Sequence, residues 1–126
     1  MKKIQFLLLF STLITFSAYA QKEVKTISIH VDGVCDMCKE RIENALDVNG
    51  VKYAKWDKQS HDCEIMYRTD KITEEELHSL LNQAGHDTDK SRASDSAYEA
   101  VHDCCKYREL SKQSEHSDHT GHSDQE

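Results

Sequence analysis

The sequence has no proline and only four glycines among its 126 residues, and it lacks the short motifs on which many enzymes depend. It contains no G-x-S-x-G nucleophile elbow, no phosphate-binding P-loop and no G-x-G-x-x-G dinucleotide loop. Each of these motifs places a nucleophile or a set of backbone N–H groups where a substrate needs them. Because none is present, we expect that the protein is not an enzyme.

Basic residues are also scarce. The chain carries 16 Lys and Arg against 23 Asp and Glu, which gives a formal net charge of -7. Nucleic acids and anionic membrane surfaces attract proteins with a surplus of Lys and Arg, because these side chains displace the counterions of phosphate groups. The sequence therefore predicts no nucleic-acid partner and favours cations or basic proteins as partners.

Long apolar runs are limited to residues 4–16. This run follows Lys2 and Lys3 and precedes the motif A-Y-A that ends at Ala20, an order typical of a secretory signal peptide. The run is too short to be read as a membrane span. We expect cleavage near Ala20 to leave a periplasmic or secreted protein without stable membrane insertion. Loss of residues 1–20 removes two Lys and no acid, so the net charge becomes -9. An uncleaved anchor is the alternative.

The following part of the chain alternates strand and helix patterns. Strands are indicated by period-two alternation, and helices by apolar residues three and four apart. The predicted elements are a strand at 26–31, a helix at 38–47, strands at 51–57 and 63–68, a helix at 73–84 and a polar edge strand at 86–91. This β-α-β-β-α-β order predicts an α+β, ferredoxin-like βαββαβ sandwich in which two helices cover one face of a sheet.

Composition divides the chain after the signal peptide into three parts. Residues 21–91 hold these elements and form the predicted domain. Residues 92–110 form a Cys-containing extension, in which 94–102 is a weaker helix candidate. Residues 111–126 contain no apolar residue, so we expect a disordered tail that cannot offset its ordering entropy by burial. The tail carries three imidazoles, which suit either metal capture or simple solvation: His116, His119 and His122.

Five cysteines follow the signal peptide, and an odd number cannot all pair within one chain. Two belong to Cys35-Asp36-Met37-Cys38, between a strand and a helix start, where backbone N–H groups and the helix dipole lower a thiol pKa. Two thiolates suffice for Cu(I) or Hg(II), whereas tetrahedral Zn(II) needs two more ligands. A local disulfide is the alternative, but so small a ring adds about 2 kcal/mol, against roughly 10 kcal/mol for a thiolate metal site.

The sequence around this motif resembles the heavy-metal-associated domain family, which includes small copper chaperones, modules of metal-pumping ATPases and a periplasmic mercury-binding protein. Residues 31–43 are similar to its metal loop and first helix. The resemblance covers roughly residues 24–91 and implies a βαββαβ fold. It also implies a metal site at Cys35 and Cys38 that passes a soft ion to a partner's cysteines by ligand exchange. The similarity continues through Gly50-Val51, Trp56, Ile65-Met66-Tyr67, Lys71-Ile72-Thr73 and Ala84-Gly85.

Two positions depart from the pattern of this family. The segment Gly33-Val34-Cys35 is one residue shorter than the usual loop and lacks the methionine that anchors it. His86 stands where the family tends to place Tyr or Lys, after the glycine that ends the second helix. Its imidazole is a candidate third metal ligand, and a histidine that only forms hydrogen bonds or faces solvent is the alternative.

The adjacent pair Cys104-Cys105 lies outside the resemblance. Neighbouring Cα atoms are about 3.8 Å apart, closer than a disulfide prefers, which favours metal binding or bonds elsewhere. We hypothesise that the helix at 94–102 returns the pair to the C-x-x-C motif and completes a thiolate-rich site. An independent second site or a solvent-facing pair is the alternative. Cys63 alternates with apolar strand residues, which predicts a buried thiol in the core.

These features predict an exported metallochaperone or metal scavenger that binds a heavy-metal ion. Cu(I) is the favoured ion, and Zn(II) and Hg(II) are alternatives. A metal-transporting membrane protein or another metal acceptor is the expected partner, and the chain is expected to be a monomer or a metal-bridged dimer. A thiol–disulfide oxidoreductase is the runner-up, although thioredoxin-like enzymes typically hold a cis-proline against their cysteines. The predicted ligands are Cys35, Cys38, Cys104, Cys105 and His86.

Overall fold

The computed structural model describes residues 23–110, so the predicted signal peptide at 1–20 and the predicted tail at 111–126 lie outside the described residues. Within 23–110, no helix is long and apolar enough to cross a membrane. The elements in chain order are β1 (Val24–His30), α1 (Asp36–Ala45), β2 (Val51–Trp56), β3 (Asp62–Arg68), α2 (Glu74–Gln83), α3 (Asp95–Glu99) and a 3-10 turn at Asp103–Cys105.

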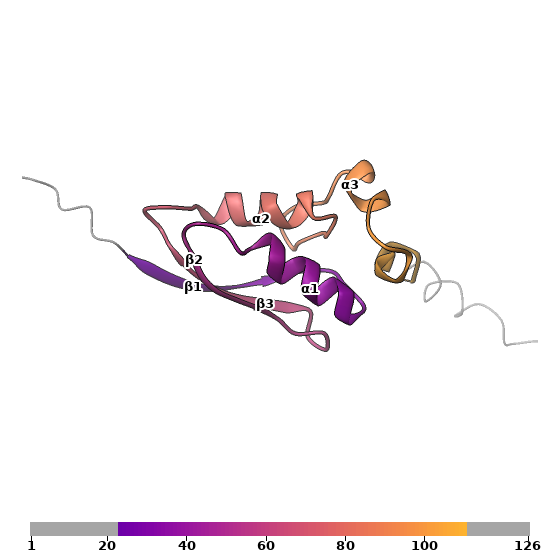
Figure 1. Ribbon diagram of the computed structural model, residues 1–126, viewed down its shortest axis with the longest axis horizontal. Helices are drawn as coiled ribbons and strands as arrows, with labels where there is room; N and C mark the ends of the chain where they lie inside the picture. The colour runs from indigo at the N-terminus through magenta and orange to yellow at the C-terminus, as the bar shows by residue number, and fades with distance from the viewer. Residues whose placement is uncertain (1–22, 111–126) are drawn as a thin grey trace, which may run out of the picture.

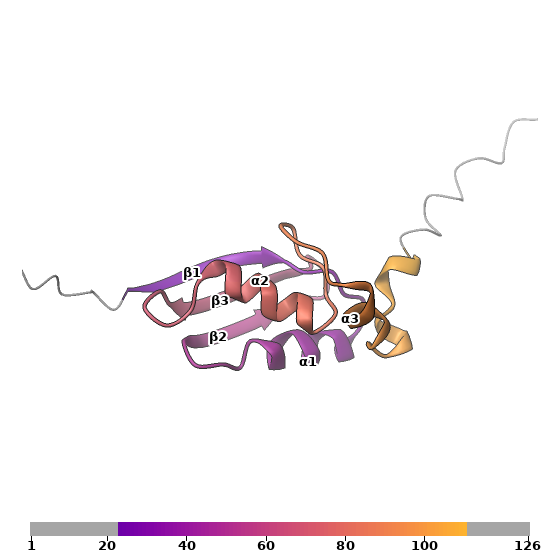
Figure 2. The ribbon, with the colours of Figure 1, turned by 90° about the horizontal axis from the view of Figure 1, so that it is seen from above.

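The three strands form an antiparallel sheet in the order β1-β3-β2. Side chains alternate along the central strand β3, so that Cys63, Ile65 and Tyr67 are buried while the residues between them are exposed. The longer helices, α1 and α2, lie on one side of the sheet (Figure 1, Figure 2). The core therefore fills the space between this pair of helices and the sheet, as the ferredoxin-like prediction requires.

The second helix begins where its capping signal predicts. The Thr73 hydroxyl accepts a hydrogen bond from the Glu76 N–H at 3.2 Å, and the Glu76 carboxylate accepts one from the Thr73 N–H at 2.8 Å. A cap of this kind contributes about 1 kcal/mol to helix stability. The helix ends before Gly85, whose φ of 91° lies in the left-handed region that favours glycine. This end point sets the position of the segment that follows.

The predicted edge strand at 86–91 is reduced to one bridge, between Val31 and Thr88. Hydrogen bonds within the segment and to Asn82 in α2 take the place of a longer ladder. The Thr88 N–H donates to the Ser91 carbonyl at 2.8 Å, and the Ser91 hydroxyl donates to the Asn82 side-chain oxygen at 2.6 Å. Side chains of Ser, Thr and Asn offer the backbone such local alternatives to a sheet ladder, which explains why the strand does not extend further.

The extension packs back onto the domain (Figure 1). Val101 and Cys105 belong to the same buried cluster as the core residues of the helices and the sheet. The helix at 95–99 is shorter than the predicted 94–102, because a new turn starts at its end. There, His102 Nδ1 accepts a hydrogen bond from the Cys104 N–H at 3.3 Å and caps the 3-10 turn. This turn carries the cysteine pair toward the end of the domain where α1 begins.

Candidate metal centre

The C-x-x-C motif connects β1 to α1. Cys35 is the N-cap residue of α1, with an extended backbone, and Cys38 lies in the first helical turn. Their sulfur atoms are 3.4 Å apart, and the Val34 N–H donates to the Cys38 sulfur at 3.4 Å. Cys38 is fully buried, whereas Cys35 is partly exposed. The motif therefore presents one sulfur from the core and one at the surface.

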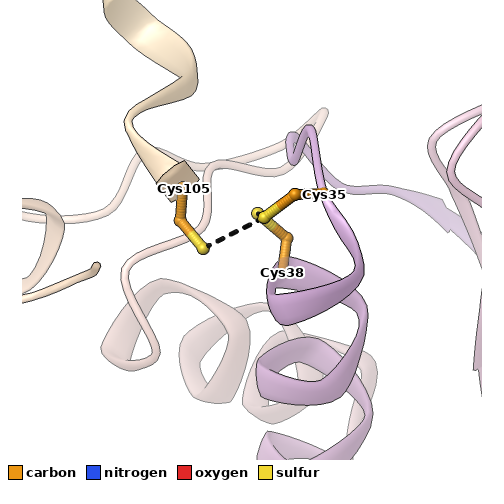
Figure 3. A group of neighbouring side chains, drawn as sticks. All are labelled: Cys35, Cys38 and Cys105. Carbon is orange, nitrogen blue, oxygen red and sulfur yellow. Dashed lines mark hydrogen bonds between the residues drawn. The ribbon is translucent and has the colours of Figure 1, made fainter. Parts of the chain in front are cut away.

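The C-terminal cysteine pair lies against this motif. The Cys35 sulfur is 3.4 Å from the Cys104 sulfur and 3.6 Å from the Cys105 sulfur. Figure 3 shows the Cys105 side chain pointing from the C-terminal segment toward the sulfur atoms of Cys35 and Cys38, and these three donor atoms all lie within 4.8 Å of one another. The exposed Cys104 sulfur is also 3.4 Å from the Met37 thioether sulfur. We call Cys35, Cys38, Cys104 and Cys105 the cysteine cluster.

This arrangement has the geometry that the shared-site hypothesis predicts, with two distant segments contributing two sulfur atoms each. This geometry does not favour an independent second site, because the Cys105 sulfur lies 3.6 Å from the Cys35 sulfur. The solvent-facing alternative fits Cys104, which is exposed, but not Cys105, which is buried. All four thiols are free. Soft metal ions prefer thiolate ligands, so the cluster has the donor set of a soft-metal site.

Two residues hold the extension in place. The Arg108 guanidinium donates to both carboxylate oxygens of Asp87, at 2.6 and 2.9 Å, and to the Ala93 carbonyl at 2.8 Å. The Tyr107 hydroxyl donates to the Gly85 carbonyl at 3.0 Å and accepts from the Asp87 N–H at 2.8 Å. Because Gly85 and Asp87 directly follow α2, the end of this helix fixes the position of the cysteine pair.

The thiols of the cluster differ in acidity. Burial raises the pKa of Cys35, but hydrogen bonds from the Cys38 N–H and from the thiols of Cys104, Cys38 and Cys105 outweigh this effect and lower the pKa to about 7. The hydrogen bond with Cys35 raises the pKa of Cys104. Burial raises the pKa of Cys105, and its contacts with Cys38 and Cys35 raise it further. Cys35 therefore forms a thiolate more readily than Cys104 or Cys105.

His86 is buried beside the extension. Its Nδ1 lies 2.8 Å from the Asp32 carbonyl, and its ring stacks on Tyr107 with centroids 5.8 Å apart. Burial lowers the pKa of His86, which keeps the ring neutral near pH 7. Among residues 23–110, no nitrogen of His86 belongs to the group of donor atoms that lie within 4.8 Å of one another at the cysteine cluster. Its role as a metal ligand stays a prediction.

Cys63 faces the core from β3, as its alternation predicts. It is fully buried, and burial raises the pKa of its thiol to about 12.

Neither Arg108 nor Tyr107 could be assigned a role from the sequence, because each contacts residues more than about two helical turns away in the chain. The available signal was an aromatic and a basic residue placed soon after a cysteine pair, in an otherwise polar segment.

No family model and no curated protein sequence matches this chain. Solved structures do match it. A putative copper-ion-binding protein from Bacillus anthracis str. Ames is 20% identical, with a TM-score of 0.51, over 53% of this chain and 97% of that one. Oxidized MerP from Ralstonia metallidurans CH34 is 19% identical, with a TM-score of 0.50, over 52% of this chain and 94% of that one. These likenesses place the fold among ferredoxin-like α+β sandwiches. More particularly, it is a heavy-metal-associated type of fold.

Proposed function

We propose that this chain is an exported metallochaperone or metal scavenger that holds a soft ion, Cu(I), in the cysteine cluster. The observation that carries the proposal is the convergence of four sulfur atoms, with neighbouring sulfurs 3.4 to 3.9 Å apart, at the start of α1. Support also comes from the structural neighbours, whose names describe a putative copper-ion-binding protein and MerP.

Cu(I) suits this donor set best. It accepts two or three thiolate ligands, and the Met37 thioether beside Cys104 adds another soft donor. Zn(II) needs four ligands in a tetrahedron, which requires all four cysteines, and Hg(II) needs only two. Cys35 supplies the first thiolate near pH 7, since its pKa is lowered to about 7, and ion binding displaces the protons of the remaining thiols.

Ion transfer requires an incoming thiolate to replace the ligands one at a time. Cys104 is exposed, whereas Cys38 and Cys105 are fully buried. An acceptor therefore displaces Cys104 first and exchanges with Cys35 next. The acidic chain favours an acceptor with a basic docking face, such as a metal-transporting membrane protein. The proposal places the protein in the periplasm or outside the cell, after signal-peptide cleavage near Ala20, as a monomer or a metal-bridged dimer.

The proposal is tested by titrating the reduced mature chain with Cu(I) against a chromogenic Cu(I) chelator. The Cu(I) affinity of Cys35→Ser/Cys38→Ser is expected to be at least about a hundredfold lower than that of the wild type. Two thiol ligands are absent from this variant, and even the loss of a group that only supports a ligand costs about tenfold or more. Cys63→Ser is the matched control, since it removes a buried thiol that is not among the grouped donor atoms of the cluster, and its affinity should stay unchanged. Equal affinity of the double variant and the wild type would end the proposal. Parallel titrations with Zn(II) and Hg(II) identify the preferred ion.

Thiol–disulfide exchange is the second candidate function, and the lowered pKa of Cys35 favours it. An oxidoreductase cycles the Cys35–Cys38 pair between dithiol and disulfide, with a substrate disulfide taking the two electrons. It should therefore reduce a disulfide-linked test peptide in the presence of a thiol reductant. Rapid turnover that is lost in Cys35→Ser, together with weak Cu(I) binding by the wild type, would favour this function over metal transfer.

A further inference from the structure

A second group of metal-binding side chains lies apart from the cysteine cluster. This group consists of His30, Asp32 and His61. Each residue offers one donor atom, and the three atoms all lie within 4.8 Å of one another. His30 ends β1, Asp32 follows it closely, and His61 stands in the turn between β2 and β3. We propose that these three residues form a second metal site, which binds a borderline divalent ion such as Ni(II) or Zn(II).

The backbone places these ligands before any ion arrives. His30 and Asp32 are two residues apart on an extended segment, so their side chains point to the same face. Between them, the Val31 N–H donates to the His61 carbonyl at 2.8 Å, which joins the turn to the strand end. On the other edge, the Asp32 N–H donates to the Asp87 carbonyl at 2.9 Å. The backbone that carries the three ligands is therefore tied on both sides.

The donor set selects a different class of ion from the cysteine cluster. Two imidazoles and a carboxylate suit Zn(II), Ni(II) and Cu(II), whereas Cu(I) and Hg(II) prefer sulfur. His30 Nε2 lies 3.7 Å from an Asp32 carboxylate oxygen, and His30 Nδ1 lies 3.5 Å from one of Asp62. The two carboxylates supply negative charge that favours a cation. The His30 side chain is 46% exposed, so an ion can reach the site from solvent.

Trp56 makes ion binding at this group measurable. It is the single tryptophan of the chain, and its ring stacks on His61 with centroids 5.7 Å apart and an interplanar angle of 16°. A paramagnetic ion bound to His61 quenches the fluorescence of an indole at this separation. Trp56 also lies near Gly33 and Cys38, so an ion in the cysteine cluster affects the same signal. Variants must therefore separate the two sites.

The experiment titrates the full mature chain with Ni(II) and follows Trp56 fluorescence. The parent is Cys35→Ser/Cys104→Ser, which removes the two accessible thiols of the cluster. When His30→Ala or Asp32→Asn is added to this parent, the Ni(II) concentration needed for half-maximal quenching is expected to rise at least about tenfold. Even the loss of a group that only supports a metal ligand reduces metal affinity by about this factor. His116→Ala/His119→Ala/His122→Ala is the matched control, because it removes imidazoles elsewhere in the chain and should leave the transition unchanged.

The outcomes are distinguishable. Quenching by one equivalent of Ni(II) that is weakened by His30→Ala and kept in the tail variant supports the site. Quenching that is identical in His30→Ala and its parent overturns it, and quenching lost only in the tail variant assigns the ion to the tail instead. Zn(II)-induced shifts of the His30 and His61 imidazole NMR signals provide a second measurement that does not depend on Trp56. None of these results depends on whether the cysteine cluster binds Cu(I).

Discussion

Cys105 is the residue that most distinguishes the cysteine cluster from a C-x-x-C motif alone. Its thiol is fully buried and lies 3.6 Å from the Cys35 sulfur, whereas its neighbour Cys104 is exposed. A buried ligand is held in position by its surroundings and pays little entropy when an ion binds, while an exposed ligand exchanges freely. The two adjacent cysteines therefore have different proposed roles, retention for Cys105 and exchange for Cys104.

Replacing each cysteine of the pair in turn tests this division. Cys105→Ala is expected to lower Cu(I) affinity at least about tenfold, equivalent to about 1.4 kcal/mol, whereas Cys104→Ala should chiefly slow transfer of the ion to an acceptor. Chelator competition measures the affinity and stopped-flow absorbance the transfer rate. Cys63→Ala is the control for Cys105→Ala, because it also removes a fully buried thiol. Equal losses of affinity in Cys105→Ala and Cys63→Ala would contradict the assignment of Cys105 as a ligand.

Gly33 is a second residue on which the metal loop depends. A Cβ at this position would lie 3.0 Å from the Cys38 Cβ and 3.0 Å from an atom of the Trp56 ring. Gly33→Ala is therefore expected to lower the free energy of unfolding by about 1 to 3 kcal/mol, the usual cost of overpacking. Urea unfolding followed by Trp56 fluorescence measures the loss. An unchanged midpoint would mean that the loop relaxes without cost.

Residues that are positioned by local sequence could be located from the sequence, whereas contacts set by distant backbone could not. The C-x-x-C spacing and the strand alternation of Cys63 are visible within a few residues. In contrast, His30 and His61 meet because the Val31 N–H bonds to the His61 carbonyl, across a turn in which His61 adopts a φ of 61°. Short-range patterns carry no information about such a contact.

At the scale of elements, the extension is the part of the structure that sets the number of sulfur ligands. Its helical turns are short, so tertiary contacts rather than helix propensity hold them. The most buried ion pair among residues 23–110 is the bidentate pair of Arg108 and Asp87, whose side chains are 11% and 14% exposed. Arg108 also lies over the Tyr98 ring, 4.2 Å from its centroid. We therefore expect release of this pair to weaken the docking of the cysteine pair on the domain.

Arg108→Ala tests this dependence. Removal of one partner from a buried ion pair costs on the order of 3 kcal/mol, so the extension is expected to undock and Cu(I) should be lost to a chelator faster than from the wild type. Hydrogen exchange of residues 95–110 should also become faster. Arg68→Ala is the matched control, because Arg68 forms a similar pair with Asp70 far along the chain from the cysteine pair. Unchanged exchange in Arg108→Ala would show that other contacts hold the extension.

Element prediction was accurate where local signals agreed with the fold. The Thr73–Glu76 capping box placed α2, and the alternation in β3 placed its buried face. A polar edge strand was predicted at 86–91, and there the structure has a single bridge. Its Ser and Thr side chains form local hydrogen bonds that compete with strand pairing. The docking of the extension could not be predicted in detail, because no repeating pattern connects it to the end of α2.

At the scale of the whole molecule, carboxylates dominate, and several are held ionised by specific partners. Burial raises the pKa of Asp87, but hydrogen bonds from Arg108 and from the Ala93 N–H outweigh burial and lower it. A hydrogen bond from Lys106 lowers the pKa of Glu99, which is an exposed side chain. A group whose pKa is lower in the folded state stabilises the fold above its ordinary pKa. That stability is lost as the pH falls through the folded value.

Acid therefore should release the extension and destabilise the fold, and Asp87 should account for much of this effect. The free energy of unfolding of the metal-free protein is expected to fall as the pH drops below about 4, the ordinary aspartate pKa. In Asp87→Asn the fall should be shallower, because the proton-linked group is absent, although stability at pH 7 is lower. Glu99→Gln is the comparison, since its exposed pair is screened by salt and should matter little at 0.5 M NaCl. Urea unfolding between pH 7 and pH 3 measures each slope. Identical slopes for wild type and Asp87→Asn would show that the Arg108 pair does not carry the acid sensitivity.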